Sequence, residues 1–295
     1  MLLILLKMRD TRARHAGLCT MSPGIERNVH LLRRAGMALE SLVVEKQDLV
    51  AVLRLNRPER LNTLTPDLIS RLDAEIRRLR DDESTRAVVL TGEGTAFCAG
   101  VQLGDEQYDP LNARTFLKNL NRVFQELESL PQPTVAALNG DAVAGGLELA
   151  LACTFRVCSG RARMGLPEAR LGLVAAVGTT YRLPRLVGFS KAAEMCLLGD
   201  LLSGDEALAC GLVNRTAAAP EFVLPEALAL ARRLAAGAPV ALGLMKDALY
   251  ANAHAGAQAD ALLEVLSASV NHYTQDKREG IQAFFEKREP RFQGR

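Results

Sequence analysis

The sequence lacks long apolar runs and paired cysteines, and each absence argues against a class of protein. No stretch of its 295 residues approaches the roughly 18 apolar residues that a membrane-spanning helix needs. Its six cysteines include no C-x-x-C pair. This pattern disfavours a zinc module or a disulfide scaffold and favours a reducing compartment.

Net charge and clustered histidine are also missing. Lys and Arg number 36 and Asp and Glu 34, giving a net charge of only +2, whereas nucleic-acid-binding proteins usually show a stronger basic bias. Four scattered histidines give little support for a histidine-centred nucleophilic triad. There is no G-x-x-x-x-G-K-[ST] phosphate loop, and Gly92-Glu93-Gly94 lacks the third glycine of a dinucleotide fingerprint. No segment has metal-ligand spacing, so we expect no metal.

The first 38 residues differ from the rest of the chain. They hold seven basic residues and two acidic ones, Asp10 and Glu26. An Arg-rich, acid-poor leader is typical of a mitochondrial transit segment. The alternatives are a disordered extension, or translation that begins at Met37. We therefore expect a mitochondrial protein, or a cytoplasmic one if translation begins at Met37.

Beyond the leader, short strands alternate with helices. Runs rich in β-branched or apolar residues at 42–45 and 49–55 predict a hairpin. Thr65 and Pro66 are typical of the N-cap and first position of a helix, and 87–90 resembles a strand buried on both faces. The other predicted elements are a loop over 91–104, a helix over 112–130, a strand over 134–138, a helix over 145–153 and a strand at 156–157.

These repeated strand, strand, helix units predict a spiral-like α/β fold. After about Pro225 the chain is almost wholly helical, with Ala and Leu at helical spacing through 261–270. No linker rich in Gly, Ser or Pro separates the two parts. We expect a leader over 1–38, an α/β core over 39–225 and a helical C-terminal segment over 226–295.

A glycine turn and a glycine-led helix are candidates for binding an oxyanion. The turn of Ala99 and Gly100 follows a buried strand, and its free N–H groups can point at an anion. Gly145 begins a helix, where the dipole also favours negative charge. The alternatives are a tight turn that merely needs Gly100, and a helix whose first-turn acid, Glu148, complements the dipole.

Two glutamates are candidates for acid–base chemistry. Glu148 lies on the first turn of the predicted helix, and Glu168 follows 20 residues later in a predicted loop. Two carboxylates that face one small cavity can act as a general acid and a general base. The alternative for Glu168 is a surface carboxylate that pairs with Arg170.

Together these segments resemble the crotonase (enoyl-CoA hydratase/isomerase) superfamily, from about residue 40 to the end. The matching segments, in family order, are LNRP (55–58), LNTL (61–64), FCAG (97–100), AGGLELALAC (144–153), MGLPE (164–168), TYRLPR (180–185) and EGIQAFFEKR (279–288). The resemblance implies a crotonase-like spiral with a helical C-terminal segment for oligomerisation.

The resemblance also implies roles for the candidate residues. The thioester oxygen of a CoA substrate would lie between the backbone N–H groups of Val101 and Gly145, and aimed donors of this kind stabilise an enolate-like transition state. Glu148 and Glu168 match the two glutamates with which hydratases position and activate a water. The presence of both favours a hydratase.

A further set of residues matches the family's substrate-binding positions. They are Arg57, Leu61, Ala99, Gln102, Leu103, Phe284 and Lys287. Phe284 and Lys287 match residues that touch the nucleotide end of CoA, often from a neighbouring subunit, although Phe284 has the alternative role of a core aromatic. CoA is part of the substrate, so no separate cofactor is expected. The resemblance implies a homotrimer or a homohexamer.

Within the superfamily, the chain is most similar to the methylglutaconyl-CoA hydratases of leucine breakdown. Members of that branch also bind AU-rich RNA through lysines of the first core helix. The matching helix here mixes charges of both signs: Arg71, Arg77, Arg78, Arg80, Asp67, Asp73, Glu75, Asp81 and Asp82. This slightly negative helix favours a solvated face, so RNA binding is not expected.

The chain departs from the family at three places. Residues 175–181 read AAVGTTY where the family often has PGAGGTQ, Gln102 stands where an Asp is common, and Thr154 replaces the Asp of an A-C-D segment. We expect the added side chains of the loop to narrow the acyl pocket or to displace the water.

The expected function is therefore that of an enoyl-CoA hydratase, a hydro-lyase that acts on a short or branched acyl-CoA in fatty-acid or leucine breakdown. Glu168 would protonate the α-carbon and Glu148 would help to activate and hold the water. The alternatives are an enoyl-CoA isomerase with one glutamate as proton shuttle, and a non-catalytic homologue that binds acyl-CoA or RNA.

Overall fold

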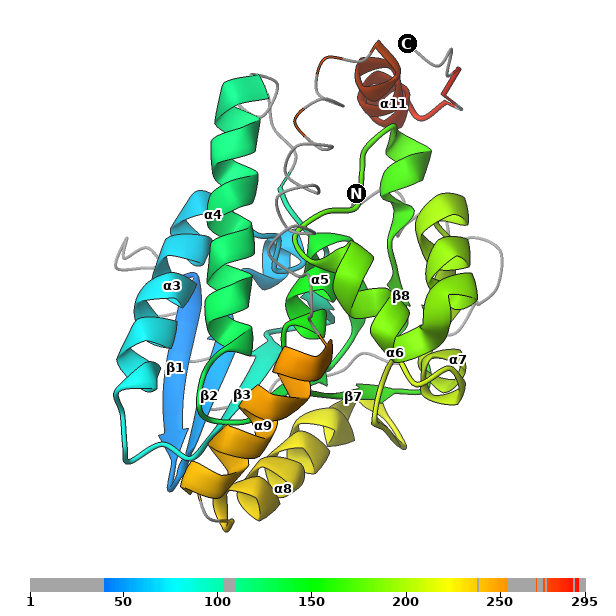
Figure 1. The fold of residues 1–295 in the computed structure, drawn as a ribbon. Helices are drawn as coiled ribbons and strands as arrows, with labels where there is room; N and C mark the ends of the chain where they lie inside the picture. The colour runs from blue at the N-terminus through cyan, green and yellow to red at the C-terminus, as the bar shows by residue number, and fades with distance from the viewer. Residues whose placement is uncertain are drawn as a thin grey trace, which may run out of the picture.

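The computed structural model describes residues 40–102, 110–237, 239–253, 269, 273, 275–288 and 290–291. The predicted leader over 1–38 and nearly all of the helical stretch over 261–270 lie outside these residues. The described part is mixed α/β, which confirms the predicted fold class (Figure 1).

The larger of the two sheets in the described residues has six strands in the order β1-β2-β3-β5-β7-β10. Its strands are β1 (Leu42–Gln47), β2 (Val50–Leu55), β3 (Ala87–Gly92), β5 (Thr134–Leu138), β7 (Phe155–Ser159) and β10 (Arg215–Ala217). β1 and β2 form the predicted antiparallel hairpin, and all other neighbours are parallel.

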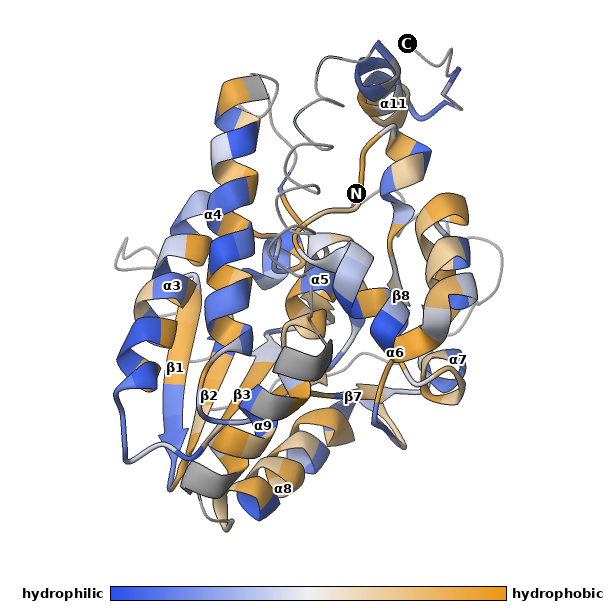
Figure 2. Ribbon diagram, viewed as in Figure 1, coloured by the Kyte–Doolittle hydropathy of each residue, from blue (hydrophilic) through white to orange (hydrophobic). Residues whose placement is uncertain are grey.

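Helices cover both faces of this sheet, which explains why its central strands are apolar throughout (Figure 2). In β3, Val88 and Leu90 face a core shared with α3 (Pro66–Arg80) and α4 (Pro110–Glu128), whereas Ala87 and Val89 face α8 (Val223–Ala235). Successive side chains of a strand point to opposite faces. The prediction of a strand buried on both faces is therefore confirmed.

Helix α3 begins as its sequence predicts. Thr65 is the N-cap, and its hydroxyl accepts a hydrogen bond from the Leu68 N–H at 3.3 Å, with Pro66 at the first helical position. The apolar side chains predicted to share one face of the helix are all buried: Leu68, Ile69, Leu72, Ile76 and Leu79.

A second sheet of four short strands corrects two predictions. Its strands are β4 (Ala96–Cys98), β6 (Asp141–Val143), β8 (Arg163–Gly165) and β9 (Leu201–Ser203), in that order. β4 lies inside the loop predicted over 91–104, and β8 and the 3-10 helix η3 (Pro167–Leu171) replace the loop predicted around Glu168. β4 and β8 have only three residues each, which is too short for an alternation of polar and apolar residues to be recognised in the sequence.

The remaining helices surround the two sheets. They are η1 (Pro58–Arg60), α5 (Gly145–Leu151), α6 (Thr179–Ala193), η4 (Glu194–Leu198), α7 (Gly204–Ala209), η5 (Pro220–Phe222), α9 (Pro239–Ala253) and α11 (Gln275–Glu286). Figure 1 shows α11 at the end of the molecule opposite α8 and α9. The predicted boundary between 225 and 226 falls inside α8, which packs on the large sheet.

Candidate functional site

Three parallel strands of the small sheet end at one edge, and the segments that follow them carry the predicted site. β4 leads to Val101, β6 to α5 with Glu148, and β8 to η3 with Glu168. The Ala144 N–H donates to the Gly165 carbonyl at 2.9 Å and continues the β6–β8 pairing to the point where both chains turn away. Sheet pairing therefore brings together residues that are far apart in the sequence.

The N–H groups of Val101 and Gly145 lie close together at this edge. A Cβ atom on Gly145 would be only 3.3 Å from the Val101 nitrogen. Val101 forms a bridge with Leu64 in which Gly100 and Gln102 make the hydrogen bonds. Among the described residues, neither the Val101 nor the Gly145 N–H donates a hydrogen bond, so two adjacent donors are available to an oxyanion.

Glycines let these backbones approach. Gly100 has φ +95°, so the turn does need glycine. This need does not conflict with a role of the Val101 N–H as a donor. Gly146 packs α5 against β4, because a Cβ atom there would lie 2.0 Å from the Cys98 carbonyl oxygen. Only glycine permits that contact, and the contact fixes the position of the helix that carries Glu148.

Glu148 is buried and bound by the loop that precedes α6. Its side chain projects from the first turn of α5, and the residue is only 4% exposed. Its Oε1 accepts hydrogen bonds from the Ala176 N–H at 2.9 Å and the Thr179 hydroxyl at 2.8 Å. These contacts go beyond what a helix-capping acid requires.

Glu168 is also buried, and the surface-carboxylate alternative is wrong. The residue is 9% exposed, and Arg170 pairs with Asp200 instead. Burial raises the pKa of the Glu168 carboxyl to about 7, because a desolvated carboxylate is disfavoured. Its Oε2 is buried and has no hydrogen-bond partner among the described residues. Such an orphaned polar atom in a native fold calls for a functional explanation.

The predicted substrate-binding residues near the turn form a polar side and an apolar side. Arg57 donates to the Thr63 carbonyl at 2.8 Å and to Gln102 Oε1 at 3.2 Å. Ala99 belongs to a small apolar cluster with Leu61 as a partly buried neighbour, and the Ala99 N–H donates to the Leu61 carbonyl at 2.9 Å. The remaining residue of this region, Leu103, lies outside the described residues.

The C-terminal pair lies on α11 and directly after it. Phe284 is half-buried and meets the Phe285 ring edge-on, with centroids 5.5 Å apart. Lys287 follows the helix with φ +57°. Gly280 brings α11 against η3, since a Cβ atom on it would lie 2.1 Å from the Leu171 carbonyl oxygen. The helix that carries Phe284 therefore packs on the turn that carries Glu168.

Sequence reasoning assigned no role to Asn62, Ala176 or Thr179. Asn62 is fully buried; its Oδ1 accepts from the Arg57 N–H at 2.8 Å, and its Nδ2 donates to the Glu93 and Ala96 carbonyls at 2.9 Å each. Asn62 lies in a family-matching segment, which was the available clue. Ala176 and Thr179 lie in the divergent loop, which was expected to narrow the acyl pocket or to displace the water but not to bind Glu148.

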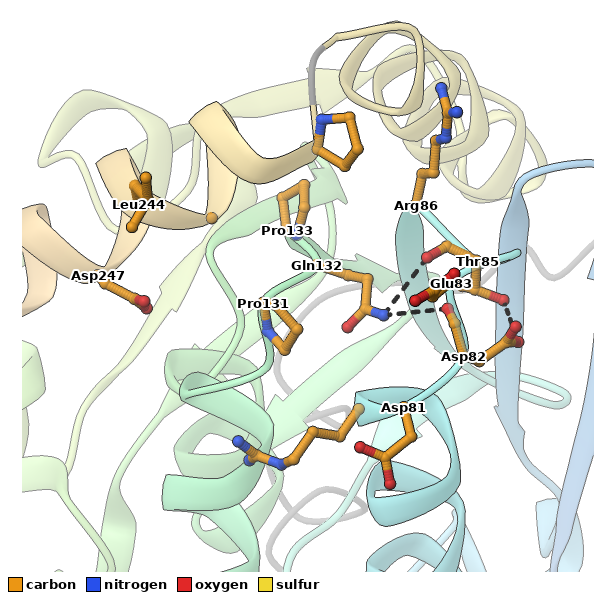
Figure 3. Close-up of a pocket in the computed structure, with 13 residues that line it drawn as sticks. Asp81, Asp82, Glu83, Thr85, Arg86, Pro131, Gln132, Pro133, Leu244 and Asp247 are labelled. Atoms are coloured by element: carbon orange, nitrogen blue, oxygen red, sulfur yellow. Dashed lines mark hydrogen bonds between the residues drawn. The ribbon is translucent and has the colours of Figure 1, made fainter.

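A cavity of about 850 Å³ lies elsewhere, at the amino ends of β3 and β5 (Figure 3). Gln132, Pro131 and Asp247 are among the residues that line it, and none of the predicted site residues does. This cavity is therefore separate from the candidate site.

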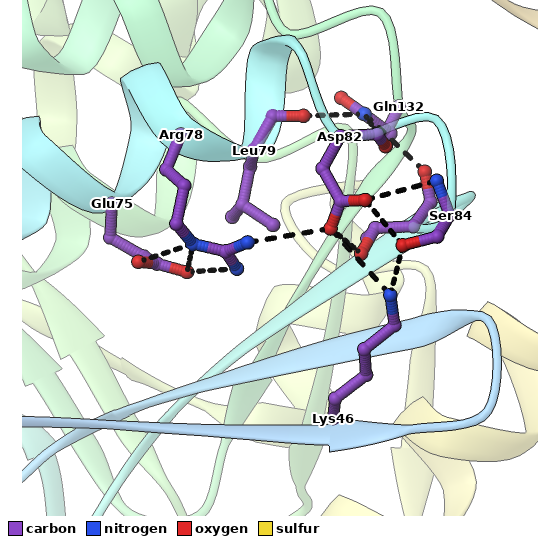
Figure 4. Close-up of polar contacts among 8 residues, drawn as sticks. Lys46, Glu75, Arg78, Leu79, Asp82, Ser84 and Gln132 are labelled. Carbon is purple, nitrogen blue, oxygen red and sulfur yellow. Dashed lines mark hydrogen bonds and ion pairs between the residues drawn. The ribbon is translucent and has the colours of Figure 1, made fainter.

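The arginines of α3 are paired with acids. Arg71 contacts Asp67 at 3.1 Å, Arg77 contacts Asp73 at 3.0 Å, and Figure 4 shows Arg78 between Glu75 and Asp82. This pairing accords with the solvated face that the sequence predicts. Within the described ranges, no helix has the length and hydropathy to cross a bilayer, and no three His, Cys, Asp or Glu side chains gather as metal ligands.

Comparisons with known proteins agree with this architecture. The crotonyl-CoA hydratase of Syntrophomonas wolfei is 36% identical over 262 residues, covering 87% of this chain and 99% of that protein. The mitochondrial enoyl-CoA hydratase domain-containing protein 2 of Bos taurus is 38% identical over 250 residues, covering 83% and 84%.

A crystal structure of an enoyl-CoA hydratase from Mycobacterium avium subsp. paratuberculosis superposes with a TM-score of 0.79 at 28% identity, over 87% of this chain and 100% of that one. The family model for enoyl-CoA hydratase/isomerase matches residues 45–295. The chain therefore belongs to the enoyl-CoA hydratase/isomerase family.

Proposed function

We propose that this protein adds water across the 2,3 double bond of a short or branched enoyl-CoA thioester. The observation that carries the proposal is that two buried glutamates, Glu148 and Glu168, lie on segments that follow adjacent strands of the small sheet, as do the neighbouring N–H groups of Val101 and Gly145. An acid, a base and an oxyanion site are the parts that hydration of an enoyl thioester needs.

Each group of the candidate site has one role in the proposed hydration. The Val101 and Gly145 N–H groups hold the thioester oxygen and stabilise the negative charge that develops on it. Glu148 accepts a proton from the water as the water attacks the β-carbon, and Glu168 donates a proton to the α-carbon. The pKa of Glu168, raised to about 7 by burial, leaves a substantial protonated fraction near neutral pH, as an acid requires.

The rest of the substrate would lie along the predicted CoA-binding residues. Arg57 and Gln102 border the turn, and Phe284 and Lys287 would reach the nucleotide end. CoA arrives with the substrate, so no separate cofactor is proposed. The family and the Syntrophomonas relative, a crotonyl-CoA hydratase, support this substrate class. The bovine relative's name supports the proposal of a mitochondrial location.

We also propose a trimer or a hexamer. Three large apolar side chains of α9 are exposed, Leu244 at 65%, Met245 at 56% and Leu249 at 72%. Monomeric proteins rarely expose a cluster of large apolar side chains, and such a cluster often marks a protein–protein interface.

Hydration is tested by following the loss of the enone absorbance of crotonyl-CoA with wild-type protein, Glu148→Gln and Glu168→Gln. Wild type should turn over, and each variant should lose about 100- to 10,000-fold in kcat, the usual contribution of a positioned acid or base. A wild type that binds the thioester without turnover would overturn the proposal. Double-bond migration without water addition would instead identify an isomerase.

A further inference from the structure

The loop before α6 places a hydroxyl against Glu148 at a position where the family often has glycine. Thr179 is the first residue of α6 and is fully buried. Its Oγ1 lies 2.8 Å from Glu148 Oε1, and the Ala176 N–H donates to the same oxygen at 2.9 Å. A glycine at residue 179 would remove this hydroxyl and keep the backbone donor of Ala176.

We propose that Thr179 is a positioning residue for the proposed hydration: its hydroxyl orients the Glu148 carboxylate and favours the ionised form that accepts the proton of water. This inference rests on the proposed function. Thr179 itself touches no substrate in this scheme and acts only through Glu148.

The Thr179 hydroxyl lies within hydrogen-bond distance of two acceptors, Glu148 Oε1 and the Ala176 carbonyl oxygen. Which of them it donates to depends on the charge of Glu148. Thr179 Oγ1 is also 3.0 Å from the Ala176 carbonyl oxygen. A hydroxyl has one proton, and a hydrogen bond to a charged acceptor is stronger than one to a neutral carbonyl. The proton therefore turns to the carboxylate while Glu148 is ionised, and it can turn to the Ala176 carbonyl once Glu148 is neutral.

Burial increases the importance of the hydrogen bond between Thr179 and Glu148. Glu148 is 4% exposed and Thr179 is fully buried, so bulk water cannot replace a lost donor. The last torsion of a glutamate side chain is soft, and a second donor on Oε1 restricts it. Glu168 differs, because its Oε2 is buried and has no hydrogen-bond partner within the described part of the chain. The two carboxyls thus have opposite environments, as an acid and a base working together require.

The test compares Thr179→Val, which removes the hydroxyl and keeps the volume, with Thr179→Ser, which keeps the hydroxyl. We expect Thr179→Val to lower kcat for crotonyl-CoA about 10- to 100-fold, the range expected for a hydrogen bond to a charged group, with KM unchanged. The acidic limb of its pH–rate profile should move to higher pH. Thr179→Ser should restore most of the rate and the wild-type profile.

Two controls separate positioning from packing. Thr91→Val removes another buried hydroxyl, one that donates to the Ala137 carbonyl at 3.0 Å on β3, and should leave kcat unchanged. In a Glu148→Gln background, Thr179→Val should cause no further loss, because interacting residues are not additive.

A Thr179→Val protein with the wild-type rate and pH profile would overturn the inference alone. So would a Thr179→Ser protein as impaired as Thr179→Val, since the presence of the hydroxyl would then not account for the rate. A wild type that hydrates no enoyl-CoA would overturn the proposed function and the inference with it.

Discussion

At the scale of single residues, one strained residue lies next to the candidate oxyanion site. Ala144 precedes Gly145 and has φ 54° and ψ −129°, a conformation that residues with a Cβ atom rarely adopt. Such strain costs about 1–3 kcal/mol, whereas glycine in an ordinary conformation costs about 0.5–1 kcal/mol in entropy. We expect Ala144→Gly to raise the free energy of unfolding by about 1 kcal/mol, as measured by urea denaturation.

The matched control is Ala142→Gly on β6. Ala142 is fully buried and is not among the positive-φ residues, so its replacement relieves no strain and should destabilise the protein by about 1 kcal/mol. Equal destabilisation by both variants would show that the Ala144 conformation stores no strain.

The buried acid Glu168 should make stability depend on pH. Its pKa is about 7 in the folded protein against an ordinary value of 4.5. The folded state therefore retains a proton that the unfolded chain releases, and the free energy of unfolding falls as pH rises between these values. The loss amounts to roughly 3 kcal/mol and is complete above the folded-state pKa.

Glu168→Gln should remove this dependence. Relative to wild type, the variant should gain roughly 3 kcal/mol of stability between about pH 4 and about pH 8.5, as measured by urea unfolding at both values. Glu83→Gln, at an exposed glutamate, should show no such gain. In wild type, kcat/KM should decline above about pH 7 as Glu168 loses its proton. A pH-independent difference between Glu168→Gln and wild type would contradict the buried-acid assignment.

The sequence indicates individual candidate residues more readily than their surroundings. Glu148, Glu168 and Gly145 are candidates because they lie in segments that match the family. The hydroxyl contact of Thr179 was not found, because Thr179 and Glu148 are 31 residues apart and only the path of the loop brings them together. Glu168 shows the same limit, since its burial depends on packing that no local pattern encodes.

At the scale of elements, a buried ion pair ties α6 to α4 and supports the loop around Glu148. The Arg182 guanidinium donates to both Glu128 oxygens at 2.9 Å and to the Val177 carbonyl at 3.0 Å. The two side chains are only 2% and 12% exposed. Arg182→Met should destabilise the protein by about 3–5 kcal/mol, because Glu128 stays buried without its guanidinium partner.

Adding Glu128→Leu to Arg182→Met should recover part of that loss in denaturant unfolding, since the buried carboxylate that lost its guanidinium partner is then removed as well. Lys191→Met breaks an exposed pair with Glu194, whose side chains are 33% and 44% exposed, and should cost less than about 1 kcal/mol. An Arg182→Met protein as stable as Lys191→Met would contradict the supporting role of the buried pair.

Several elements of five or more residues were predicted from the sequence, whereas the three-residue strands β4 and β8 were not. The span of β5 agrees residue for residue, and the N-cap of α3 is as predicted. The strands β4 and β8 have three residues each, and their extended conformation depends on pairing with β6 rather than on their own composition. Because these are the strands that lead to Val101 and Glu168, the geometry of the site emerges only in the folded chain.

At the scale of the whole molecule, the order of the matching segments was sufficient to predict the fold class and family, because they match one family along nearly the whole chain after the leader. How copies assemble is a separate question that depends on surface residues. The proposed interface on α9 presents Leu244, Met245 and Leu249 to solvent in a single chain.

An assembly held together by α9 should dissociate when charge is placed on that surface. Leu244→Glu combined with Leu249→Glu would bury two carboxylates in the interface, a cost that apolar contacts there cannot offset. We expect sedimentation equilibrium to show a trimer or hexamer for wild type and a monomer for the double variant. Val44→Glu makes the same change on β1, at a side chain that is 41% exposed, and should leave the mass unchanged. A double variant with the wild-type mass would place the interface elsewhere, since the exposed α9 side chains would then be dispensable for assembly.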